Sequence, residues 1–120
     1  ILVVIQLDVI CLRNTSRLIA LFRQFEGLAE RVKLVVNRSG SLESEISLKK
    51  AEETLKIPVS WQIPNASRTF QESRSKGAPL SETAKGSRPH QVFLDIARSL
   101  SPPSPESSSK PRRGFFAAFL

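Results

Sequence analysis

The chain of 120 residues alternates short apolar runs with longer segments in which apolar residues recur every three or four positions. The run at residues 1–5 is continuous and rich in β-branched side chains, which is typical of a strand buried on both faces of a parallel sheet. Residues 32–36, which include Lys33, predict a second strand. Residues 58–63 follow a proline boundary and predict a shorter third strand. Because helical segments separate the strands, we expect parallel right-handed crossovers and an α/β layered sheet.

Helical periodicity predicts four helices, over residues 14–25, 44–55, 66–75 and 90–100. The expected inner face of the first helix consists of Leu18, Leu21, Phe22 and Phe25. That of the last helix consists of Val92, Phe93, Ile96, Ala97 and Leu100. Gly27 is expected to cap the end of the first helix, Asn65 the start of the third, and Trp61 is expected in the core.

Composition excludes several classes of protein. The longest uninterrupted apolar run, residues 1–5, is far shorter than the ~20 residues that a membrane-spanning helix needs. The single Cys11 cannot form an internal disulfide, and the single His90 cannot build a zinc site.

The chain contains no Met, and three strands are few for such a sheet, so we expect it to be the C-terminal part of a longer protein.

The formal net charge is +7, but most of the basic residues are scattered among apolar positions or offset by nearby acidic ones. The one dense basic cluster lies at residues 110–113. This distribution favours solvated faces and a basic tail over an extended surface for an anionic partner. Aromatic residues are not interleaved with the cations of the first helix, which disfavours a nucleic-acid partner without excluding phosphate contacts.

The composition changes abruptly after Leu100. Residues 101–109 contain no apolar side chain, which predicts a disordered Pro/Ser linker. Residues 110–120 form a basic, amphipathic tail, whose candidate membrane-contacting or partner-contacting residues are Lys110, Arg112, Arg113, Phe115, Phe116 and Phe119. One interpretation is an anchor on an anionic membrane surface. The alternative is a tail that packs on another part of the protein or stays disordered.

Five short motifs follow one another along the chain: Val4-Ile-Gln-Leu-Asp8, Leu12-Arg13-Asn14, Leu34-Val-Val-Asn37-Arg38, Ile63-Pro64-Asn65 and Lys76-Gly77-Ala78-Pro79-Leu80. Together they resemble the C-terminal half of the MinD/ParA-type P-loop ATPases over residues 1–100. The spellings Gln-Leu-Asp, Leu-Arg-Asn and Ile-Pro-Asn are most similar to the CpaE/TadZ branch, which serves Flp/Tad pilus assembly. The resemblance implies a three-layer P-loop NTPase-type parallel sheet with helices on both faces, of which this chain is the C-terminal part.

The resemblance also implies a site for the adenine base. Asn37 and Arg38 match the family motif whose Asn hydrogen-bonds adenine, and Pro64 and Asn65 match the turn that packs beside the base. An amide suits adenine because it donates and accepts at once, and ligands of open α/β sheets bind at the carboxyl ends of strands. From the residues alone, the alternative is that Asn37 caps a loop and Asn65 caps a helix.

ATP hydrolysis requires groups that this chain does not contain. It has no Gly-x-x-x-x-Gly-Lys-Ser/Thr loop for the phosphates. In the family this loop and the aspartates beside Mg²⁺ lie upstream of the first strand expected here. The resemblance therefore implies ATP and Mg²⁺ as cofactors of the full-length protein, and we assign no catalytic or metal-binding residue within these 120 residues.

The resemblance implies a homodimeric cytoplasmic ATPase, with peripheral contact to the inner face of the cell membrane through the tail. Such a protein acts as a nucleotide-dependent positioning or assembly factor, here for Flp/Tad-type pilus or secretion machinery. Two alternatives remain: a chromosome-partitioning or septum-site-determining ATPase, and a degenerate TadZ-like hub that does not hydrolyse ATP.

Overall fold

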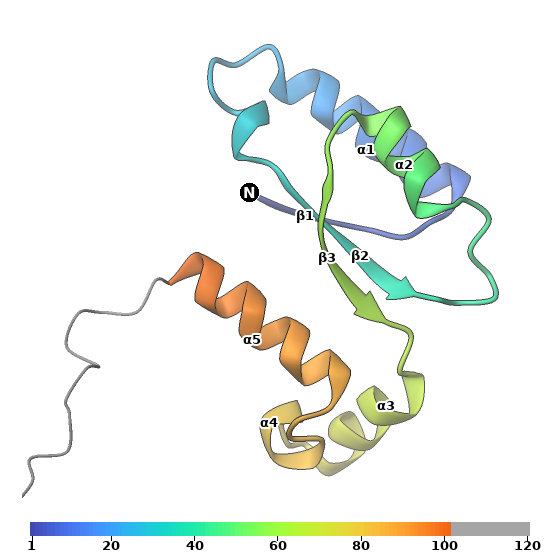
Figure 1. Cartoon of the computed structure of the whole chain (residues 1–120), viewed down its shortest axis with the longest axis vertical. Helices are drawn as coiled ribbons and strands as arrows, with labels where there is room; N and C mark the ends of the chain where they lie inside the picture. The colour runs from blue at the N-terminus through green and yellow to red at the C-terminus, as the bar shows by residue number, and fades with distance from the viewer. Residues whose placement is uncertain (102–120) are drawn as a thin grey trace, which may run out of the picture.

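The computed structural model describes residues 1–101, in which three parallel strands form one sheet. The strands are β1 (Leu2–Ile5), β2 (Lys33–Ser39) and β3 (Val59–Pro64), arranged in the order β1-β2-β3 (Figure 1). β2 is central and pairs in parallel with both neighbours, in regular register with β1 and with two irregularities along β3. The predicted strands, their parallel pairing and the α/β class are confirmed.

Helices flank both faces of this sheet. They are α1 (Val9–Phe22), the 3₁₀ turn η1 (Ala29–Arg31), α2 (Leu48–Leu55), α3 (Ser67–Lys76), α4 (Leu80–Thr83) and α5 (Arg88–Leu100). Figure 1 shows α1 and α2 together on one side of the sheet, with α3, α4 and α5 grouped at the other. Within residues 1–101, none of these helices is long and apolar enough to cross a bilayer.

The predicted linker after residue 101 and the predicted tail at residues 110–120 lie outside the described residues. The same holds for the candidate contact residues of the tail, Lys110, Arg112, Arg113, Phe115, Phe116 and Phe119.

One face of the sheet packs tightly against α1 and α2. The buried cluster on this face consists of Ile5, Leu7, Leu12, Ile19, Val32, Leu34, Val36, Ala51 and Leu55. Leu34 and Val36, on the central strand, are both 0% exposed. Full burial of one such side chain contributes about 1.5–3 kcal/mol, so this cluster is the main apolar core of the described residues.

The start of α1 differs from the sequence prediction. The helix begins at Val9 instead of near Asn14, and Asp8 is its N-cap, with Oδ1 accepting a hydrogen bond from the Cys11 backbone N–H at 2.7 Å. Val9 and Ile10 are β-branched and have modest helix propensity, which hides this first turn from a pattern of residue preferences. The cap satisfies an otherwise unpaired amide and fixes the true start.

The buried face of α1 differs as well. It consists of Leu12, Thr15 and Ile19. Three of the four residues expected there are exposed, by 37% at Leu18, 48% at Leu21 and 57% at Phe25. Thr15 is accommodated in the core because its Oγ1 donates a hydrogen bond to the Cys11 carbonyl oxygen at 2.8 Å. Because a threonine lies at the centre of this buried face, the face does not stand out in the sequence as a stripe of apolar residues.

Other helix ends also shift, and side-chain caps explain most of the shifts. α2 begins after Ser47 and α5 after Ser87, and each serine hydroxyl accepts a hydrogen bond from the backbone N–H three residues on. α3 begins after Ala66 without a side-chain cap, so the prediction of Asn65 as its N-cap was wrong. Gly27, with φ 70°, lies in a turn beyond the end of α1 and does not cap it.

The second face of the sheet is covered less completely. The expected inner face of α5 holds only in part: Val92 and Ile96 are half-buried, whereas Phe93 and Leu100 are 42% and 58% exposed. The buried residue of this helix is Pro89. Trp61 is only partly buried, and the Nζ of Lys33 lies 5.4 Å from the centroid of its ring. This cation–π contact explains how the tryptophan keeps an open face.

We expect Leu34→Ala to lower the free energy of unfolding by about 2–5 kcal/mol, because it leaves a cavity in the fully buried cluster. Leu42→Ala is the matched control, since Leu42 is 104% exposed, and it should change the free energy of unfolding by less than about 0.5 kcal/mol. Urea denaturation followed by circular dichroism measures both. Equal shifts for the two variants would contradict the packing described here.

An ion pair on the surface of α3 gives a second prediction. The Lys76 ammonium donates a hydrogen bond to the Glu72 carboxylate at 2.6 Å, and this bond, together with the charge of Lys76, lowers the pKa of Glu72. The pair therefore stabilises α3 above the ordinary pKa of a glutamate, and this contribution is lost as the pH falls through the lowered pKa. Lys76→Gln should raise the Glu72 pKa, measured by NMR titration of the carboxyl carbon, whereas Lys85→Gln should leave it unchanged.

Candidate functional site

The polar residues predicted as a site lie where β2 and β3 end. Because the two strands are parallel, their carboxyl ends meet at one edge of the sheet, where Ser39 pairs with Pro64. The backbone N–H of Asn65 donates a hydrogen bond to the Ser39 carbonyl oxygen at 2.9 Å and extends this contact by one residue. The segments around Asn37 and Asn65, far apart in the sequence, are thereby held side by side.

These strand ends border a groove of about 770 Å³, which is called the strand-end groove below. It is lined by Val4, Asn37, Arg38, Ile63, Pro64, Asn65, Ala66, Ser67, Phe70, Gln71, Arg74 and Phe93. All four predicted base-contacting residues are among them. The volume lies within the range of about 300–1,000 Å³ that small-molecule sites occupy.

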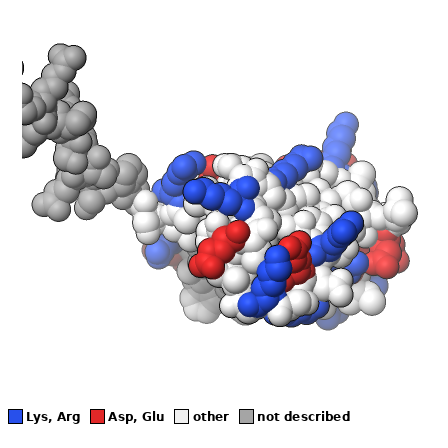
Figure 2. Space-filling view, turned by 90° about the horizontal axis from the view of Figure 1, so that it is seen from below, with Lys and Arg blue, Asp and Glu red and all other residues white. Residues whose placement is uncertain are grey.

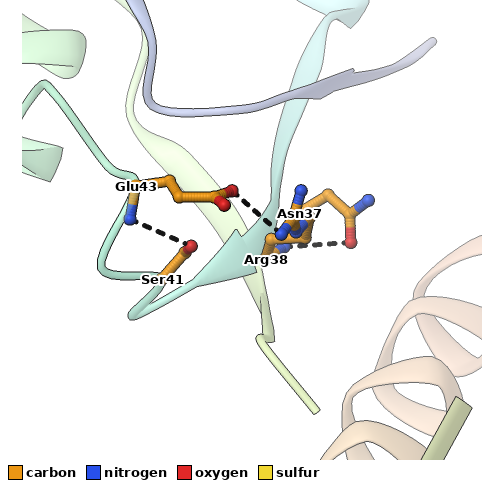
Figure 3. Close-up of polar contacts among 4 residues, drawn as sticks. All are labelled: Asn37, Arg38, Ser41 and Glu43. Atoms are coloured by element: carbon orange, nitrogen blue, oxygen red, sulfur yellow. Dashed lines mark hydrogen bonds and ion pairs between the residues drawn. The ribbon is translucent and has the colours of Figure 1, made fainter. Parts of the chain in front are cut away.

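Asn37 projects from the end of β2 as a half-buried side chain. Its Oδ1 accepts a hydrogen bond from the backbone N–H of Arg38 at 3.0 Å (Figure 3), which fixes the plane of the amide. Among the described residues, no hydrogen bond engages its Nδ2. The amide therefore retains two N–H donors and a second lone pair on Oδ1 for a ligand in the groove.

Arg38 adopts a left-handed backbone conformation, with φ 56°, which is uncommon for a residue with a side chain. Its Nη2 lies 3.1 Å from Oε2 of Glu43, and the Glu43 backbone N–H donates to the Ser41 hydroxyl oxygen at 3.2 Å (Figure 3). An ion pair this exposed adds little stability. Its effect is to direct the guanidinium toward the loop between β2 and α2, beside the rim of the groove.

The sequence prediction missed the helical wall of the groove. Ser67, Phe70 and Arg74 recur along α3 at helical spacing and all face the groove. The ring of Phe70 meets that of Phe93 on α5 edge to face, with centroids 6.4 Å apart and planes at 82°. The spacing along α3 was visible in the sequence, but Phe93 could be placed here only by the tertiary fold.

A second cavity lies at the carboxyl ends of β1 and β2. It has a volume of about 20 Å³, which is enough for one water molecule. Gln6, Asp8, Asn37 and Ser41 are among its lining residues. Within residues 1–101, no group of three or more His, Cys, Asp or Glu side chains could hold a metal ion.

The charged groups around the site are mixed in sign. On the face seen in Figure 2, Lys and Arg alternate with Asp, Glu and uncharged residues and do not form a continuous basic patch. Two of the cations of α3 and α5 are engaged by acidic neighbours one turn away, in the pairs Lys76–Glu72 and Arg98–Asp95. Arg74, in contrast, makes no ion pair among the described residues.

Three solved structures are similar to this fold. The ParA family ATPase from Chlorobium tepidum TLS matches with a TM-score of 0.71 and 26% identity, over 83% of this chain and 40% of that one. The cell division ATPase MinD of Pyrococcus furiosus matches with a TM-score of 0.66 and 24% identity, over 82% and 40% of the two chains. The septum site-determining protein MinD from Pyrococcus horikoshii OT3, complexed with Mg-ADP, matches with a TM-score of 0.65 and 21% identity, over 84% and 41%.

No protein-family model and no curated protein matches the chain. The chain spans about two fifths of the length of the solved structures that it matches. The parallel order of the strands, the helices on both faces and these three neighbours agree with one another. The chain thus has the α/β fold of the ParA and MinD P-loop ATPases.

Proposed function

We propose that this chain is the C-terminal part of a MinD/ParA-like ATPase and that the strand-end groove holds the adenine base of ATP. The observation that carries the proposal is the convergence of Asn37, Arg38, Pro64 and Asn65 on one groove of ligand size at the carboxyl ends of β2 and β3. Polar groups at this edge of a parallel sheet are where open α/β folds bind their ligands.

The groove offers both kinds of contact that a purine base needs. The Asn37 amide has free N–H donors and a carbonyl oxygen with remaining acceptor capacity, which matches the adjacent donor and acceptor on the Watson–Crick edge of adenine. Val4, Ile63 and Pro64 supply apolar surface for the flat faces of the ring. Asn65, which is exposed and has no capping role, is free to contact the base.

In this proposal the phosphates and Mg²⁺ are bound by residues that precede this chain in the full-length protein. The cation there would neutralise the charge that develops on the phosphates during hydrolysis. The horikoshii MinD neighbour is complexed with Mg-ADP, which supports nucleotide and Mg²⁺ as cofactors. The role of this chain is to bind and orient the base and to present helices to partners.

For the biological role, we favour a cytoplasmic, homodimeric positioning or assembly factor for Flp/Tad-type pilus or secretion machinery. The support is the similarity of the Gln6-Leu7-Asp8, Leu12-Arg13-Asn14 and Ile63-Pro64-Asn65 spellings to the CpaE/TadZ branch. The basic, aromatic sequence of residues 110–120 supports peripheral contact with an anionic membrane.

A second candidate role is chromosome partitioning or septum-site determination. It is favoured by the neighbours, which are a ParA family ATPase, a cell division ATPase and a septum site-determining protein. A third is a TadZ-like hub without hydrolysis. An intact Gly-Lys-Ser/Thr loop in the upstream sequence would favour an ATPase over the hub, and salt-sensitive DNA binding by the full-length protein would favour partitioning.

We expect Asn37→Ala in the full-length protein to weaken ATP binding by about 1–3 kcal/mol, because the base edge loses its polar partner. Binding of GTP, whose base edge reverses the donor and acceptor, should change little. Asn14→Ala is the matched control, since Asn14 is an exposed asparagine of α1 outside the groove. Calorimetric titration measures the binding of ATP and GTP to Asn37→Ala and of ATP to the Asn14→Ala control. Equal ATP affinity for Asn37→Ala and the unsubstituted protein would refute the assignment.

A further inference from the structure

The outer face of α1, which points away from the sheet, carries exposed apolar residues together with its polar ones. A surface helix normally buries one apolar stripe and carries polar residues opposite it. α1 buries Leu12, Thr15 and Ile19, yet Ile10 and Leu21 on its outer face are 75% and 48% exposed. Single exposed apolar residues are ordinary, but here they lie along one face of the same helix.

A groove runs beside this face, between α1 and α2, and is called the helix groove below. It has a volume of about 340 Å³ and is lined by Val9, Leu12, Arg13, Ser16, Arg17, Ile46 and Thr54. α1 and α2 lie in one layer, side by side over the same face of the sheet (Figure 1). The groove is therefore formed entirely by neighbouring elements of this chain, and Val9, Arg13 and Arg17 at its rim are exposed.

The charged residues that line the helix groove are both arginines. α1 contains Arg13 and Arg17 and no acidic residue, and neither arginine forms an ion pair within residues 1–101. The two are four residues apart, so they lie on the same side of the helix and repel each other. Two acidic side chains reach the start of α1: Asp8 caps the helix, and Glu45 accepts a hydrogen bond from the Val9 backbone N–H at 3.3 Å.

We propose that the helix groove docks an acidic amphipathic helix of a partner protein. A groove between two helices can accommodate a third helix, whose apolar side chains would pack against Val9 and Ile46 in the groove and against the exposed Ile10 beside it. Its carboxylates would pair with Arg13 and Arg17, which then have the partners that this chain does not supply. This docking surface goes beyond the nucleotide-binding role proposed above and does not depend on it.

The composition of the surface favours a protein partner over nucleic acid. Surfaces that contact a phosphate backbone are polar and strongly cationic. The helix groove combines two arginines with exposed aliphatic side chains. Protein–protein interfaces have this arrangement, in which a charged rim surrounds an apolar centre and both contribute to recognition. The complementary partner is a helix on which carboxylates alternate with Leu or Ile.

The test uses the full chain and two fluorescein-labelled amphipathic peptides of about 18 residues, long enough to become helical. One peptide carries Glu beside its Leu stripe, and the other carries Lys at the same positions. In fluorescence anisotropy, the Glu peptide should bind the unsubstituted chain, and Arg13→Glu/Arg17→Glu should weaken this binding at least about tenfold. The same variant should gain affinity for the Lys peptide.

The matched control is Lys85→Glu/Arg88→Glu, which makes the same change in net charge at two exposed positions, one before α5 and one at its first residue. It should leave the affinity for both peptides unchanged, and circular dichroism verifies that both double variants are folded. Equal weakening by the two double variants, or no binding of the Glu peptide, would overturn the proposal. A third result would also overturn it: neither peptide binds, but the unsubstituted chain binds phosphatidylglycerol vesicles and Arg13→Glu/Arg17→Glu does not. The surface would then contact lipid.

Discussion

The parallel pairing of β2 with both of its neighbours is the constraint on which the rest of the structure depends. Leu34, Val35 and Val36 are between 0% and 1% exposed, because this strand is covered on both edges by β1 and β3 and on both faces by side chains. α1 lies in the connection from β1 to β2 and α2 in that from β2 to β3, and both helices pack back on the sheet, as parallel crossovers require. Asn37 and Arg38, near the end of β2, are therefore positioned by a strand that is paired on both sides.

The two faces of the sheet serve different purposes. The α1–α2 side carries the continuous apolar cluster and supplies most of the stabilisation from burial. The other side is only partly covered, with Val4 60% exposed and Phe93 42% exposed. The strand-end groove lies on this open side, where a ligand can approach the strand ends without displacing packed core residues.

The sequence predicted the three strands well because their signal is local. A strand such as residues 32–36 is stable only when its apolar side chains are buried, and the need to bury them also determines its register against the neighbouring strands. The four residues assigned to the base also proved to be neighbours, since strand ends of a parallel sheet meet at one edge.

What the sequence did not predict depends on side-chain hydrogen bonds and tertiary contacts. The Asp8 cap determines the start of α1, and Thr15 belongs to the buried face only because its hydroxyl bonds back to the chain. The position of Phe93 in the groove wall requires α5 to cross back over β3. Neither a capped start nor a long-range contact produces a periodic pattern of apolar residues.

The loop between β2 and α2 connects the two grooves. Arg38 and Glu43 lie at its strand-end side, whereas Glu45 and Ile46 reach the start of α1, where both of their backbone N–H groups donate to the Leu7 carbonyl oxygen. Ile46 also lines the helix groove. A ligand in one groove can influence the other only if the loop has two arrangements that the ligand binds with different affinity. The loop meets the geometric part of that condition, because Glu43 contacts Arg38 of the strand-end groove and Ile46 lines the helix groove. Single hydrogen bonds and one exposed ion pair hold the side chains of Ser41, Glu43 and Glu45.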